Sequence, residues 1–109
     1  MSDNNELPIA CKLSERELVL RRQEIDESVF QDAEQVEELA DGYAFKYTYD
    51  AAIVAKLADF IAVERRCCPF FTFELIFEQG EGPLWLRLRG GEGVKEFIRD
   101  GLNAPGRMA

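Results

Sequence analysis

The sequence predicts a single α+β domain in which helices pack on a mainly antiparallel sheet of four to five strands. Two stretches alternate apolar with polar residues, which is typical of half-buried strands. Asp41-Gly42 and Glu81-Gly82 each mark a turn that precedes a strand and then a helix, at a spacing of 40 residues. Such hairpin–helix units favour a sheet covered by helices. The length of 109 residues suits one domain, 1–109, with an ordered core at about 8–102 and frayed termini.

The N-terminal third predicts a short strand and one helix. Residues 9–13 alternate apolar with small or polar side chains. Ser14 and Glu17 have the spacing of a capping box, so we expect a helix from there to about Phe30. Its apolar face contains Leu18, Ile25 and Val29, and its polar residues are expected toward water: Arg21, Arg22 and Glu24.

The central third predicts an aromatic strand followed by a longer helix. Aromatic residues occupy every second position of the strand and so share one face: Tyr43, Phe45, Tyr47 and Tyr49. Asp50 is a suitable N-cap for a helix over about 51–67. That helix must end near Cys67, because Pro69 pushes the residue before it out of the helical region.

The C-terminal third predicts a hairpin of residues 71–77 with 84–88, and a last helix at about 92–102. If Phe77 faces Leu84, two further pairs follow on the outer surface: Glu74 with Arg87, and Ile76 with Trp85. The alternation of the strand would place Phe70 on the same outer face. Phe70, Ile76 and Trp85 would then form an exposed apolar patch. A patch of this kind usually marks a partner surface, so a homodimer or another protein partner is expected there.

Composition excludes several classes of function. A net charge of −8 disfavours nucleic acids and anionic membranes, because both are bound by clustered Lys and Arg. The N-terminus has no secretory signal and the longest apolar stretch is too short to span a bilayer, so we expect a soluble, cytoplasmic protein. With no histidine, the usual general base and the commonest zinc ligand are missing. Three cysteines without disulfide-scaffold spacing predict reduced thiols.

The adjacent pair Cys67-Cys68 is the main candidate site. Adjacent Cα atoms lie ~3.8 Å apart, less than the usual disulfide span of roughly 4.4–6.8 Å, so a bond between the two would be strained. Two free thiols there could instead chelate one soft ion such as Cu(I), Zn(II), Hg(II) or As(III). Cys11 is a possible third thiolate. The alternative is that the cysteines are core packing, since free Cys is among the most buried residue types.

Glu64 and Arg65 are the predicted neighbours of the thiols. Glu64 lies three and four residues before the cysteines on the same helical face, where it could accept a thiol hydrogen bond or act as a base. The competing interpretation is an ion pair with Arg65 or with an arginine of the neighbouring strand. The direction of the thiol pKa stays open: a helix C-terminus disfavours thiolate, whereas Arg65 and Arg66 favour it.

The segment Glu64-Arg65-Arg66-Cys67-Cys68-Pro69-Phe70, with Gly82-Pro83-Leu84-Trp85-Leu86, resembles a family of small uncharacterised bacterial proteins. The Glu-Arg-x-Cys-Cys-Pro-Phe motif is similar to segments in the tails of some MerR-type, metal-responsive regulators. The resemblance covers roughly residues 9–102 and implies no established activity. It favours a thiol or metal site, and the chain has no helix-turn-helix segment that would make it a regulator itself.

The sequence therefore predicts a non-enzymatic cytoplasmic binding module with no catalytic residues and no assigned cofactor. Its candidate ligands for a soft metal or metalloid are Cys67, Cys68 and Cys11, with Glu64 and Arg65 behind them. One alternative is a thiol oxidoreductase in which one cysteine is the nucleophile and the other resolves. Another is a structural interaction subunit that uses the face of Phe70, Ile76 and Trp85.

Overall fold

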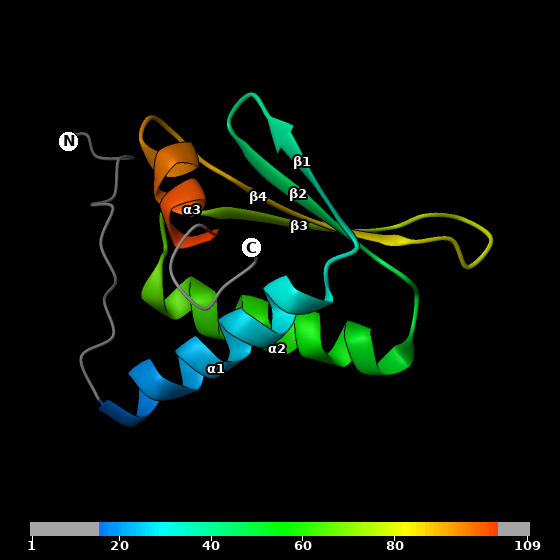
Figure 1. Cartoon of the computed structure of the whole chain (residues 1–109), viewed down its shortest axis with the longest axis horizontal. Helices are drawn as coiled ribbons and strands as arrows, with labels where there is room; N and C mark the ends of the chain where they lie inside the picture. Colours follow the sequence, from blue (N-terminus) through cyan, green and yellow to red (C-terminus); the bar gives the residue numbers. More distant parts are fainter. Residues whose placement is uncertain (1–15, 103–109) are drawn as a thin grey trace.

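Helices and strands form where the spacing of apolar residues predicts them (Figure 1). The structure is a computed structural model, and it describes residues 16–102. The elements along the chain are α1 (Arg16–Asp32), β1 (Gln35–Leu39), β2 (Gly42–Tyr47), α2 (Ala51–Cys67), β3 (Thr72–Phe77), β4 (Leu84–Arg89) and α3 (Val94–Leu102). The strand expected at residues 9–13 and the cap at Ser14 lie outside the described residues. No helix within residues 16–102 is long and apolar enough to cross a membrane.

The strands form one antiparallel sheet in the order β1-β2-β4-β3. The pairs β1–β2 and β3–β4 are hairpins, and pairing of β2 with β4 joins them. The predicted cross-strand partners are all found: Phe77 with Leu84, Glu74 with Arg87 and Ile76 with Trp85. The predicted α+β class, with two hairpin–helix units, is therefore confirmed.

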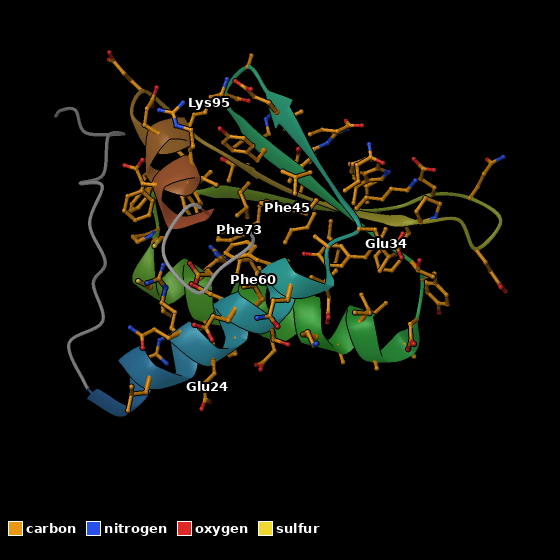
Figure 2. All side chains as sticks on the ribbon, in the orientation of Figure 1. Glu24, Glu34, Phe45, Phe60, Phe73 and Lys95 are labelled. Atoms are coloured by element: carbon orange, nitrogen blue, oxygen red, sulfur yellow. The ribbon has the colours of Figure 1, made fainter. Side chains whose placement is uncertain are left out.

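One face of the sheet is apolar, and all three helices pack against it. The buried strand residues on this face are Tyr43, Phe45, Tyr47, Leu84, Leu86 and Leu88. The helices add Val29 and Phe30 from α1, Leu57 and Phe60 from α2, and Val94 and Ile98 from α3. In Figure 2, Phe45 and Phe60 lie between the sheet and the helices, whereas Glu24 projects from α1 toward solvent. This core joins the three helices to the sheet.

The helix α2 begins and ends at the predicted residues. The side chain of Asp50 accepts a hydrogen bond of 2.8 Å from the backbone N–H of Ala52, which caps the first turn. β2, however, ends at Tyr47, and Tyr49 is 46% exposed rather than on the inner face. The prediction for Tyr49 is wrong because the chain leaves the sheet there to reach the cap.

Candidate functional site

The C-terminal end of α2 places both adjacent cysteines in the interior. The backbone N–H of Cys68 donates to the carbonyl of Glu64 at 2.6 Å, which completes the last turn before Pro69. Cys67 and Cys68 are each 0% exposed. The helix end expected from Pro69 is confirmed, and it directs the two sulfurs to the same side of the chain.

The two sulfurs are close but not bonded to each other. Their Sγ atoms lie 3.5 Å apart, whereas a disulfide bond measures about 2.05 Å. Cys68 is a free thiol. Cys67 is disulfide-bonded, so its partner is not Cys68. The prediction of reduced thiols is confirmed for Cys68 and wrong for Cys67, because the strain argument excluded only a bond between neighbours. Cys11 lies outside the described residues.

Glu64 pairs with Arg22, which was predicted from the sequence to face water. Its carboxylate is 2% exposed and accepts two hydrogen bonds from Arg22 of α1: Nε to Oε2 at 2.8 Å and Nη2 to Oε1 at 3.3 Å. The expected partners, Arg65 or a strand arginine, are not the ones used. Arg65 and Arg66 are exposed.

A signal for Arg22 exists in the sequence of α1. It lies seven residues before the buried Val29 and four before the buried Asp26, so it shares their helical face. Asp26 is 3% exposed and lies 3.4 Å from the Arg22 Nε. Two buried carboxylates on facing helices require a cation between them, and Arg22 supplies it.

The electrostatics of this cluster keep Cys68 protonated. Arg22 Nη2 lies 3.7 Å from the Cys68 Sγ. Burial raises the pKa of the Cys68 thiol to about 12, and the charge of Glu64 adds to burial while Arg22 opposes it. Burial also opposes the charge of Arg22, but its hydrogen bond and ion pair with Glu64 outweigh this and raise the pKa of Arg22. The sequence left open whether the pKa of the thiol is raised or lowered, and for Cys68 burial raises it.

Metal-ligating side chains are sparse in the described part of the chain. Within residues 16–102 no group of three or more His, Cys, Asp or Glu side chains is placed to hold a metal ion. Cys67 is in a disulfide bond and Cys68 is protonated, so the two sulfurs do not present a pair of thiolate ligands in this state. Arg65, predicted behind the thiols, is exposed, and Arg22 occupies the place beside Cys68.

The predicted apolar patch is only partly assembled. Ile76 and Trp85 are neighbours on the outer face, and Trp85 Nε1 donates to Glu78 at 3.1 Å. Phe70 packs instead on the core side, with its ring centroid 4.9 Å from that of Phe71 and 5.3 Å from that of Phe97. The placement of Phe70 was wrong because β3 begins at Thr72, so the alternation of the strand does not extend to Phe70.

Comparison with known proteins adds no assignment. No family model matches the chain, and neither a curated protein nor a solved structure matches it significantly. The resemblance to small bacterial proteins with a Glu-Arg-x-Cys-Cys-Pro-Phe motif stays a prediction. The candidate functional site is therefore the cluster of Arg22, Asp26, Glu64, Cys67 and Cys68.

Proposed function

We propose that this chain is a non-enzymatic, cytoplasmic binding module whose reduced Cys67–Cys68 pair chelates a soft metalloid ion such as As(III). The observation that carries this proposal is the 3.5 Å separation of the two Sγ atoms. Thiolates select soft ions over hard ones. Once Cys67 is reduced, the two thiols at the end of one helix would stand close enough to bind the same ion.

The separation of the sulfurs favours a bent coordination geometry. With ion–sulfur bonds of ~2.3 Å, sulfurs 3.5 Å apart subtend roughly 100° at the ion. A linear ion such as two-coordinate Hg(II) would need sulfurs roughly 4.6 Å apart for the same bond length. A pyramidal ion with three bonds fits the smaller angle, and we propose Cys11 as its third ligand.

Binding must displace a proton from Cys68. The pKa of about 12 means that the thiol is protonated at neutral pH, so an ion must compete with that proton. This competition lowers the affinity for weakly thiophilic ions and leaves only strongly thiophilic ones bound. The affinity should therefore rise with pH.

The disulfide at Cys67 makes the proposed site dependent on redox state. A sulfur in a disulfide cannot act as a thiolate ligand, so the site opens only when Cys67 is reduced. Disulfides in cytosolic proteins are usually transient or redox-sensing. Reduction would then be the step that permits binding.

A thiol oxidoreductase is the second candidate, because the Cys68 sulfur lies 3.5 Å from that of the disulfide-bonded Cys67. The pKa of about 12 at Cys68 argues against this function. The attacking species is the thiolate, and the best attacking thiols have a pKa near the ambient pH. A third candidate is an interaction subunit with the cysteines as core packing, which their complete burial favours.

Calorimetry with arsenite separates these candidates. Reduced wild-type protein should bind arsenite, while Cys67→Ser and Cys68→Ser should each abolish tight binding. Cys11→Ser should weaken binding, and oxidised wild type should not bind. If reduced wild type and Cys68→Ser respond equally to arsenite while the variant melts lower, the cysteines are packing. Turnover of a thiol–disulfide substrate that requires Cys68 would favour the oxidoreductase.

A further inference from the structure

A cavity of about 410 Å³ lies where α1, α2 and α3 meet the sheet. This volume is within the roughly 300–1,000 Å³ that small-molecule sites occupy. Its described lining comes from α1, α2, the segment before β3, β4 and α3, and neither Cys67 nor Cys68 is among these lining residues. The cavity is therefore distinct from the proposed thiol site, although Arg22 and Glu64 border both.

Two pairs of aromatic rings form the apolar part of the lining. Phe30 of α1 and Phe60 of α2 pack edge to face with centroids 5.8 Å apart. Phe71 and Phe97 form a second edge-to-face pair, 6.0 Å apart, where α3 meets the segment before β3. All four rings line the cavity. Aromatic faces attract an organic cation as well as an apolar body.

Among the described residues, the polar part of the lining carries more negative than positive charge. Three carboxylates, those of Asp26, Glu64 and Asp100, face one guanidinium, that of Arg22. Arg22 is already engaged, because its Nε and Nη2 donate to Glu64 and it also pairs with Asp26. An anionic ligand would have to approach two buried carboxylates, whereas a cationic one would be attracted by them.

We propose that this cavity binds a small organic amine with an aryl or alkyl body. The ammonium group lies at the carboxylate side, near Glu64 and Asp100, and the body lies among the four rings. The charge of the lining selects the cation, and the rings supply apolar burial. The net charge of −8 of the whole chain acts in the same direction by attracting cations from solution.

Three probes of the same shape and different charge test the proposal on the full chain. Isothermal titration should show that 2-phenylethylamine binds at least about fivefold tighter than 2-phenylethanol, and that 3-phenylpropionate binds weakest. Equal binding of the amine and the alcohol would leave only an apolar cavity. Tighter binding of the acid, or binding of none of the three, would also overturn the proposal.

A matched pair of variants on α3 locates the ligand. Asp100 and Glu96 are both exposed, but only Asp100 lines the cavity. Asp100→Asn should weaken phenylethylamine binding roughly two- to fivefold, and Glu96→Gln should leave it unchanged. Equal weakening by both variants would mean that the amine responds to the overall field and not to this cavity, which would refute the location.

The amine site and the thiol site should fail independently. Phe97→Leu should weaken amine binding, whereas the matched change Phe77→Leu, at a ring that is 52% exposed, should not. Cys68→Ser should retain amine binding, and Asp100→Asn should retain arsenite binding. Loss of both ligands in one of these variants with an unchanged melting curve would contradict two separate sites.

Discussion

Two arginines of this protein make similar ion-pair networks in different surroundings. Arg22 joins Glu64 and Asp26 between helices, with side-chain exposures of 22% for Arg22 and 2% for Glu64. Arg89 joins Asp41 at 3.0 Å and Glu74 at 3.1 Å on the outer face, where all three side chains are between 37% and 42% exposed. The distances are alike, so the difference lies in hydration. A buried charge that loses its partner is costly, whereas an exposed one is rehydrated by water.

The largest effect is expected from removing the buried carboxylate. Glu64→Gln should lower the free energy of unfolding by about 2–4 kcal/mol, because Arg22 would keep its charge without its main partner. The matched change Glu74→Gln, on the outer face, should cost no more than about 0.5 kcal/mol. Urea denaturation of the two variants measures both values. Similar losses would show that burial does not separate the two networks.

The second prediction concerns coupling between Arg22 and Glu64. Arg22→Met and Glu64→Leu should each destabilise the fold, and the double variant should be less destabilised than the sum by about 1–3 kcal/mol. A hydrophobic pair can replace a buried ion pair, although Asp26 then loses its cation as well. The corresponding cycle of Arg89 with Glu74 should give a much smaller coupling energy, because water and salt screen that pair. Additive effects at Arg22 and Glu64 would contradict the buried pair.

The third prediction concerns alkaline pH. The folded pKa of Cys68 is raised to about 12, so its proton is held more tightly in the folded than in the unfolded chain. Stability from this thiol is complete below the unfolded pKa of ~8.5 and is lost as pH rises toward the folded value, by at most about 1.4 kcal/mol per pH unit. Burial also raises the pKa of Tyr47, which acts in the same direction above pH ~10.

Urea denaturation midpoints measured at pH 8 and pH 9.5 separate the contribution of the Cys68 thiol to stability from that of Tyr47. Wild type should lose stability over this range, and Cys68→Ala should lose less. Tyr47→Phe is the control, because tyrosine scarcely titrates there and its slope should equal that of wild type. An identical slope for wild type and Cys68→Ala would mean that the thiol is not held in its protonated form.

The smallest effect is expected at the exposed network. Arg89→Gln should change stability less than any of the buried substitutions, and the difference should shrink when salt is raised, because exposed pairs are screened. Melting curves at low and high ionic strength measure this. A loss that persists in high salt would place the Arg89 network in the same energetic class as the Arg22 network.

Local sequence patterns predicted the fold because the position of each helix and strand depends on the residues within it and next to it. The alternation in β3 and β4 set their pairing to the residue, and Asp50 and Pro69 bounded α2. Phe70 and Tyr49 were placed wrongly because both lie where a strand has not begun or has already ended, and alternation carries no information there.

Only part of the candidate site could be predicted from the sequence. Glu64, Cys67 and Cys68 stand close in sequence, so one helical turn was enough to group them. Arg22 comes from another helix, 42 residues before Glu64, and no local pattern links the two. The state of Cys67 also depends on a distant residue, because its disulfide partner is not its neighbour. Interactions between distant parts of the chain require the tertiary structure.

The open edges of the sheet bear on how the protein behaves when concentrated. Within residues 16–102, β1 and β3 are the outer strands of the sheet, and the backbone groups of an outer strand can pair with another chain. Charged side chains stand at both edges, Glu37 and Glu38 on β1 and Glu74 on β3, and charges at an edge disfavour pairing with another chain. Lys95 lowers the pKa of Glu38, which keeps that edge charged further into acid. We therefore expect Glu38 to oppose edge-to-edge association at β1 further into acid than a glutamate of ordinary pKa would.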